Sequence, residues 1–258
     1  MNLLKIPFNA GALEKKQGIE QAPDMIVHAL KSIHLSESGI LPVFNIEEVK
    51  VDNTNIEESR QLIQRKVNLI SFPCIILGGD HSITYPCFSA FAKTAKNPGI
   101  VIFDAHPDLM DSRNTHEDYL RNLIDEKVVK PSNVLLVGIR AMHPQEISYM
   151  KKQNINNFSM KEISFKGVQE SCDSIMEVAR VWDALYLSID IDVLDPAFAP
   201  GTGYHEPGGL TTRELVYFCQ RLKLLKNLKL IDIVEVNPEK DLHGHTMRIA
   251  AKLVMELS

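Results

Sequence analysis

The sequence predicts an α/β fold, with three layers (α/β/α) around a mainly parallel central sheet. Short runs of β-branched and other apolar residues recur along the chain, and longer segments with helical spacing separate them. Strands that alternate with helices are typical of βαβ units, whose strands are parallel and buried on both faces. With 258 residues, of which 45% are hydrophobic, the chain can bury one sizeable core, so we expect a single domain over residues 1–258.

Five apolar runs are predicted to be strands. They are CIIL (74–77), IVIF (100–103), VLLVGI (134–139), ALYLSI (184–189) and LKLIDIVEV (228–236). Residues 83–95, 160–182 and 211–225 are predicted to be helical from their apolar periodicity. We expect Gly167 to interrupt the second of these helices. Thr211 and Glu214 have the spacing of a capping box, which places the start of the third helix.

Composition and charge exclude several classes of function. The net charge is −5 and no basic cluster is present, so nucleic acid is not an expected partner, whereas a small cationic molecule is not repelled. No stretch approaches the roughly 20 apolar residues of a membrane span, and the first residues lack a signal-peptide pattern, so we expect a cytoplasmic protein with no membrane partner. The four cysteines form no CxxC pair and are expected to be buried thiols.

Three polar clusters lie at the ends of predicted strands: GGDHS (78–82), DAHPD (104–108) and SIDIDVLDP (188–196). Open α/β sheets bind their ligands at the edge formed by the carboxyl ends of their strands. In an extended chain, Asp104, His106 and Asp108 would face the same way, and Asp190 and Asp192 repeat this spacing. The loop near 193–210 is rich in proline and glycine, which favours a loop shaped for a site.

The clusters together supply four carboxylates and two imidazoles, which is too many ligands for one zinc ion. An oxygen-rich set with some imidazole suits two harder divalent ions, and we predict two Mn²⁺ per chain. Carboxylates this close would repel one another without cations. The predicted metal ligands are His81, Asp104, His106, Asp108, Asp190 and Asp192.

The charge balance of the predicted site limits the class of substrate. Two divalent ions would neutralise the four carboxylates, and such a centre suits a cationic or neutral electrophile better than a phosphate ester.

Asp80 and Asp195 are interpreted as turn residues, because an acid after Gly-Gly or before Pro commonly accepts local backbone hydrogen bonds.

The same segments resemble the ureohydrolases, the family of arginases and agmatinases. GGDHS, DAHPDLMD and SIDIDVLDPAFAPGTGYHEPGGLT resemble three of its signature segments, and EVNPEKD (235–241) resembles the fourth. GIEQAPDMI (18–26) is similar to the family's N-terminal helix entry and HGHTMRIAAKLVMEL (243–257) to its final helix, so the resemblance covers essentially the whole chain. It implies an arginase-like fold, hydrolysis of a guanidino group with release of urea, and a homo-oligomer, either a trimer or a hexamer.

The resemblance also implies roles for individual residues. His81 and Asp108 would bind mainly one manganese ion, His106 and Asp192 would bind the other or be shared between the two, and Asp104 and Asp190 would bridge them.

Three of the implied roles are catalytic or substrate-binding. Asp108 would also orient the nucleophile, His116 would deliver a proton to the leaving amine and contact the substrate, and Glu235 would bind the guanidinium group.

Arginases carry an asparagine two residues after the DAHxD segment, where this chain has the apolar Met110. This difference favours agmatine, which lacks a carboxylate, although Asn114 remains a candidate for binding polar groups of the substrate. Arginase, formimidoylglutamase and another guanidino-acid hydrolase stay open as alternatives. A non-catalytic metal-binding homologue and a one-zinc amide hydrolase of the deacetylase branch are also open. His205, His243 and His245 receive no role beyond the loop or helix cap.

Overall fold

The structure is a computed structural model that describes residues 1–13 and 18–258. In this part of the chain, eight strands form one sheet in the order β2-β1-β3-β8-β7-β4-β5-β6, and neighbouring strands pair in parallel. The strands are β1 (Asn2–Ile6), β2 (Asn45–Glu48), β3 (Cys74–Gly78), β4 (Pro98–Phe103), β5 (Val134–Val137), β6 (Asn156–Phe158), β7 (Ala184–Asp190) and β8 (Leu228–Val234).

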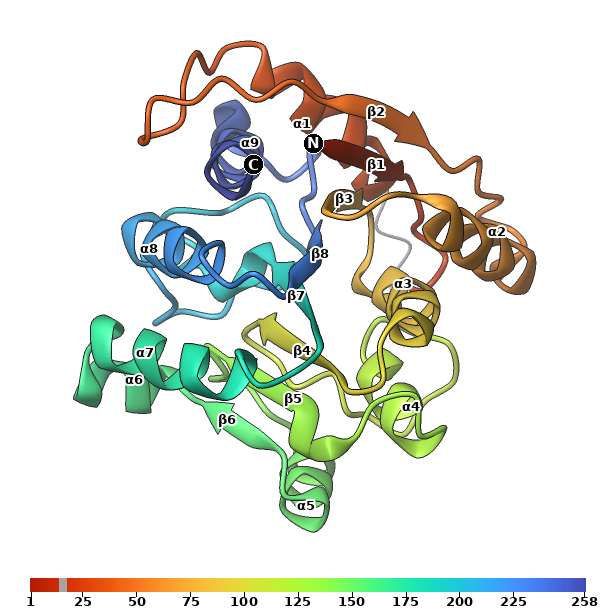
Figure 1. Ribbon diagram of the computed structural model, residues 1–258, viewed down its shortest axis with the longest axis vertical. Helices are drawn as coiled ribbons and strands as arrows, with labels where there is room; N and C mark the ends of the chain where they lie inside the picture. Colours follow the sequence, from red (N-terminus) through yellow and green to blue (C-terminus); the bar gives the residue numbers. More distant parts are fainter. Residues whose placement is uncertain (14–17) are drawn as a thin grey trace.

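Helices cover both faces of the sheet (Figure 1). They are α1 (Ala22–Leu30), α2 (Ile56–Leu69), α3 (Thr84–Phe91), α4 (Tyr119–Asp125), α5 (Pro144–Gln153), α6 (Met160–Lys166), α7 (Val168–Ala179), α8 (Thr212–Leu222) and α9 (His245–Leu257). Helices α1, α6, α7, α8 and α9 pack on one face, and α2, α3, α4 and α5 on the other. The predicted three-layer α/β/α fold is therefore confirmed.

Successive side chains of the central strands enter opposite core layers, as the two-residue period of a strand requires. In β4, for example, Val101 packs with the α7–α8–α9 side and Ile102 with the α2–α3–α4 side. Both are essentially unexposed. A strand buried on both faces is apolar at most positions, which explains why these strands appear in the sequence as nearly continuous apolar runs.

The five predicted strands are all present, and left-handed residues shorten two of them. Strand β5 stops at Val137 because Gly138 has a φ of 97°, and β8 stops at Val234 because Glu235 has a φ of 61°. The predicted helices are present as well, with the expected break at Gly167. The capping box at Thr211 forms with Glu214, as predicted.

Strands β1, β2 and β6 and helices α2, α4 and α5 lacked a recognised sequence pattern. Strands β2 and β6 form the two edges of the sheet, are short, and expose much of their surface. Edge strands lack the continuous apolar run that marks a buried strand. All four cysteines are buried free thiols, as predicted. Among the described residues, no helix has both the length and the apolar character needed to cross a membrane.

Candidate functional site

The polar clusters of the sequence meet at the carboxyl ends of four neighbouring strands, β3, β8, β7 and β4. His81 follows β3, Glu235 follows β8, Asp190 closes β7 and Asp104 follows β4. Because these strands are parallel, their carboxyl ends share one edge of the sheet, where α/β proteins bind ligands. Residues far apart in the sequence are thereby brought into one site.

The turn after β3 directs His81 into the site. A Cβ atom on Gly79 would lie 1.9 Å from the carbonyl oxygen of Phe8, so only glycine fits there. That carbonyl accepts the Asp80 N–H at 2.9 Å. The Asp80 carboxylate accepts the Ser82 N–H at 2.9 Å and so caps the single 3₁₀ turn that begins at His81. The interpretation of Asp80 as a turn residue is confirmed.

A first group of ligand atoms surrounds Nδ1 of His81. This nitrogen lies 3.1 Å from Oδ2 of Asp104, 3.2 Å from Oδ2 of Asp108 and 3.2 Å from Oδ2 of Asp190. Neither His81 Nδ1 nor Asp104 Oδ2 has a hydrogen-bond partner within the described segments. Buried polar atoms that converge without a hydrogen bond between them are the arrangement expected of the ligands of a cation.

A second group adjoins the first. Ligand atoms of Asp104, His106 and Asp192 all lie within 4.8 Å of one another, and His106 Nδ1 is 3.1 Å from Asp192 Oδ2. Asp104 belongs to both groups, since it also lies with His81 and Asp108. A carboxylate shared by two groups is positioned to bridge two ions.

The pKa values of the clustered side chains also indicate a site for cations. Burial and the neighbouring Asp104 raise the pKa of Asp108 to about 7, and burial with Asp192 and Asp104 raises the pKa of Asp190 well above its usual range. Burial opposes the protonation of His106, yet its contacts with Asp104 and Asp192 raise its pKa to about 12. Without cations, protons would have to neutralise these carboxylates. The donor set therefore fits a pair of divalent cations.

The orientation of His81 depends on three residues to which the sequence assigned no role, Ser188, Asp232 and Tyr119. Nε2 of His81 lies 2.8 Å from Oγ of Ser188, and this hydroxyl donates to Oδ1 of Asp232 at 2.6 Å. Tyr119 places its hydroxyl 3.0 Å from the same Nε2. Because the serine proton points to the carboxylate, Oγ is left to accept Nε2–H, and Nδ1 remains free of a proton as a ligand must be. The signal in the sequence for two of them was a polar residue among apolar neighbours within a strand, Ser188 in β7 and Asp232 in β8.

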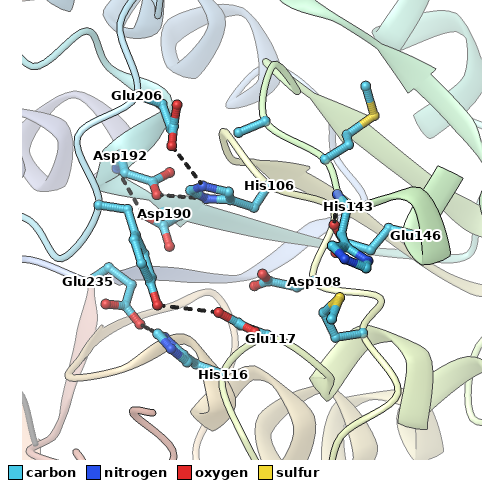
Figure 2. A pocket seen from close by; sticks show the side chains of 14 residues that line it. His106, Asp108, His116, Glu117, His143, Glu146, Asp190, Asp192, Glu206 and Glu235 are labelled. Atoms are coloured by element: carbon cyan, nitrogen blue, oxygen red, sulfur yellow. Dashed lines mark hydrogen bonds and ion pairs between the residues drawn. The ribbon is translucent and has the colours of Figure 1, made fainter. Parts of the chain in front are cut away.

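His116 and Glu235 form a buried pair beside the carboxylates (Figure 2). Nδ1 of His116 is 2.9 Å from Oε1 of Glu235, and the same oxygen accepts the backbone N–H of His81 at 2.9 Å. The His116 N–H donates to the carbonyl of Gly11 at 2.9 Å. The left-handed φ of 61° at Glu235 turns the chain at the end of β8, directly beside His81 and His116.

A cavity of about 360 Å³ opens above these groups. Figure 2 shows His106 joined to Asp192, with Glu206 beside them, and His116 joined to Glu235. The cavity is lined by His106, Asp108, Met110, His116, Glu117, Ala141, Met142, His143, Glu146, Asp190, Asp192, Tyr204, Glu206 and Glu235. The ring of Tyr204 lies 5.4 Å from that of His106 and 6.0 Å from that of His116. Glu117 and Glu146 lie outside the segments singled out from the sequence, and Tyr204 and Glu206 lie within the segment at 188–211 but had been assigned no role.

Some predicted residues lie elsewhere. Asn114 does not line this cavity; it lines a separate hollow, where its side chain accepts a hydrogen bond from Arg60. Nε2 of His205 donates to a carbonyl of its own loop at 2.7 Å. His243 lines a third hollow beside α1, 6.4 Å from His245 between ring centroids. The structure therefore does not bring Asn114 to the position expected of a substrate-binding residue.

The proline- and glycine-rich loop is held against the site by Arg140. Its guanidinium donates to the carbonyls of Asp192 and Glu206, both at 2.7 Å, and to further carbonyls of the same loop. Asp195 accepts the Gly208 N–H at 2.7 Å and closes the loop from within, which confirms its turn role. The loop is shaped by these bonds, in agreement with its composition.

Comparisons with known proteins agree with this geometry. The family described as "Arginase family" matches residues 1–258. An arginase of Staphylococcus aureus (strain MSSA476) is 33% identical over 277 residues, covering 93% of this chain and 91% of that protein. The crystal structure of formimidoylglutamase from Bacillus subtilis has a TM-score of 0.94 at 29% identity, covering 99% of this chain and 85% of the other. A hypothetical agmatinase from Burkholderia thailandensis has a TM-score of 0.88 at 25% identity, covering 99% and 84%. With a family match over its full length and relatives of this similarity, the chain belongs to the arginase family of hydrolases that act on guanidino compounds.

Proposed function

We propose that the protein is a binuclear manganese hydrolase that converts agmatine and water to putrescine and urea, with residues 1–258 acting as one catalytic domain. The lining of the 360 Å³ cavity carries the choice of substrate. Among the described residues, it consists of acidic, imidazole, aromatic and apolar side chains and includes no lysine or arginine. Such a lining favours a substrate whose far end is a cation and disfavours one that ends in a carboxylate.

The metal ions would be held by the two ligand groups. His81 and Asp108 would hold mainly one ion, His106 and Asp192 would hold the other or be shared, and Asp104 and Asp190 would contribute to both. Bound divalent ions would neutralise the carboxylates and make hydroxide available from water near neutral pH. The predominance of oxygen ligands supports manganese rather than zinc.

The chain's own residues would bind and orient the substrate. Glu235 is buried and its carboxylate is fixed by the His81 N–H, so it can accept hydrogen bonds from the planar guanidinium group. Asp108 would orient the attacking oxygen. His116 touches Glu235 and lines the cavity, so a proton on its ring could pass to the departing amine of putrescine.

The remainder of the cavity suits the other half of agmatine. Met110 and Met142 offer apolar surface for a methylene chain, and Glu117 and Glu206 add carboxylates near the mouth. A glutamine at position 206 would keep the size of the side chain and remove its charge. The Glu206→Gln variant should lose kcat/KM for agmatine and gain or retain it for 4-guanidinobutyrate, whose tail is a carboxylate.

Formimidoylglutamate is a second candidate because of the relative in Bacillus subtilis, which is 30% identical over 270 residues and covers 98% of this chain. That substrate carries carboxylates at the end remote from the reacting carbon. Within the part of the chain that the structure describes, the cavity offers no cationic side chain to bind them. This observation favours agmatine over formimidoylglutamate.

The direct test is hydrolysis by the manganese-loaded protein of agmatine, arginine, formimidoylglutamate and 4-guanidinobutyrate, with urea and formamide measured. A clear preference for agmatine would support the proposal. Preference for a carboxylate-bearing substrate would refute the argument from the cavity lining. Inactivity on all four would favour a non-catalytic metal-binding homologue, and one zinc per chain with amide hydrolysis would favour the deacetylase type.

Assembly and location follow the family resemblance only. We propose a trimer or hexamer in the cytoplasm, where the product putrescine would enter polyamine biosynthesis. Sedimentation velocity of the purified protein tests the assembly directly: a single monomeric species would contradict it.

A further inference from the structure

Arg60 is a buried cation that the proposed reaction does not use. It lies on α2, and only 6% of its surface is exposed. Its guanidinium stacks over the ring of Tyr85, with 4.9 Å from Cζ to the ring centroid. Together with Ser112 and Asn114 it lines a hollow of about 420 Å³ that is separate from the cavity above the metal ligands. A buried guanidinium outside the site requires an explanation, since burying a charge without compensation is costly.

The hydrogen bonds of Arg60 are few. Nη1 donates to Oδ1 of Asn114, whereas Nε and Nη2 are buried and have no acceptor among the described residues. Within the same residues, no carboxylate forms an ion pair with Arg60. Asn114 therefore provides the one side-chain oxygen that accepts from this cation. Moving Asn114 away would leave the guanidinium without a side-chain acceptor among the described residues, so the interaction restrains the loop as well as partnering the arginine.

Asn114 occupies a special place in the loop that leads to His116. It has a left-handed φ of 62°, a conformation that asparagine tolerates better than most residues. Thr115 alone separates it from His116, and the Thr115 N–H donates to Asp118 at 3.2 Å. On the other side, the His116 N–H donates to the Gly11 carbonyl and its ring contacts Glu235. The loop is thus held at two neighbouring points, by Arg60 on its outer side and by the site on its inner side.

We propose that Arg60 is a positioning residue for His116, acting through the side chain of Asn114. In this assignment Asn114 is a structural link from α2 to the loop and does not contact the substrate. The inference rests on the proposed role of His116 in proton transfer. A misplacement of about 1 Å in a catalytic group can cost about 10²-fold in rate, so a loosened loop should lower turnover without changing the metal ligands.

The test compares Arg60→Met, Arg60→Lys and Arg65→Met, the last being an exposed arginine on the same helix. For Arg60→Met we expect kcat on agmatine to fall by about 10- to 100-fold, with KM and manganese content close to those of the wild type. Arg60→Lys should recover most of the loss, because a single donor suffices for the Asn114 oxygen. Arg65→Met should match the wild type in every measurement.

Asn114→Gly provides the second arm, because glycine accepts a positive φ while removing the acceptor oxygen. It should reproduce the loss seen in Arg60→Met, and the double variant should be no worse than either single variant, since both changes remove the same bond. Losses that multiply, or an unchanged kcat in Arg60→Met, would overturn the proposal. The proposal would also be overturned if Arg60→Lys failed to restore kcat and the loss of kcat matched a loss of folded protein.

Hydrogen–deuterium exchange keeps this inference separable from the proposed function. The peptide containing Thr115 and His116 should exchange faster in Arg60→Met and Asn114→Gly than in Arg65→Met, whether or not agmatine is the substrate. If the wild type hydrolyses none of the guanidino compounds but exchange still rises, the link from Arg60 to the loop holds and the proposed function fails. Unchanged exchange would refute the link itself.

Discussion

Replacing Asp232 with asparagine should weaken metal binding from outside the ligand set. Asp232 is fully buried, and its carboxylate accepts three hydroxyl protons: from Thr84 at 2.7 Å, Tyr186 at 2.6 Å and Ser188 at 2.6 Å. Asparagine offers one oxygen and one NH₂ donor. If its oxygen keeps the Thr84 and Tyr186 bonds, which share Oδ2, its nitrogen faces the Ser188 hydroxyl.

That change reverses the direction of hydrogen bonding toward the metal site. Ser188 would then accept from the new amide and donate its own proton to Nε2 of His81. The imidazole would have to carry its proton on Nδ1, the atom that lies 3.1–3.2 Å from three aspartate oxygens. A protonated nitrogen cannot bind a metal ion. Outer partners of metal-binding histidines are typically worth about 10- to 100-fold in affinity, or about 1.4 to 2.8 kcal/mol.

Calorimetric titration of the metal-free variant with Mn²⁺ measures this effect. Ser188→Ala is the matched control, because it breaks the chain without forcing a proton onto Nδ1, and Tyr119 still contacts Nε2. We expect a smaller loss of affinity in Ser188→Ala than in Asp232→Asn. Wild-type affinity for both ions in folded Asp232→Asn would refute the reasoning.

Three further predictions concern single groups. Asp104→Asn should lose at least one of two metal ions and most activity, because Asp104 belongs to both ligand groups; elemental analysis that still finds two ions per chain would reject its bridging role. His116→Ala should keep its metal content and lose about 10²–10⁴ in kcat, the usual contribution of an acid–base group, and an unchanged rate would remove it from the mechanism. Burial raises the pKa of Cys74 to about 12 and that of Cys172 to about 11, so the thiolate forms only at high pH. The four thiols should stay unreactive toward an aromatic disulfide reagent at pH 8 and react in denaturant; rapid native labelling would contradict their burial.

The sequence predicted the parts of the fold that obey a local rule. Strands β3, β4, β5, β7 and β8 are buried on both faces, so each is mainly an apolar run. Thr211 with Glu214 marked the start of α8, because a capping box needs only four consecutive residues. Edge strand β6, with the sequence NNF, shows no such local pattern, because it forms by pairing with the neighbouring β5.

The same distinction applies to the site. The metal-ligand candidates were recognisable because close pairs such as Asp190 and Asp192 lie at the carboxyl end of a strand, and these ends meet at one edge of the sheet. Ser188 and Asp232 were not recognised because the hydrogen bond between them forms only when β7 pairs with β8. Their spacing along the chain does not reveal that contact. Asn114 was a candidate for binding polar groups of the substrate, but its side chain accepts a hydrogen bond from Arg60, which is far away in the sequence.

The strand order has a consequence for how the protein is made. Strand β3 ends at Gly78 and β4 ends at Phe103, yet the two strands that lie between them, β7 and β8, begin only at Ala184 and Leu228. A chain emerging from the ribosome must therefore keep two apolar strand edges open until nearly all of it has been synthesised. Because these strand edges pair late and with residues far along the chain, folding is slow, and the unpaired edges can associate with other chains. Production of this protein should therefore benefit from abundant chaperones, because the middle of its sheet is the last part to be synthesised.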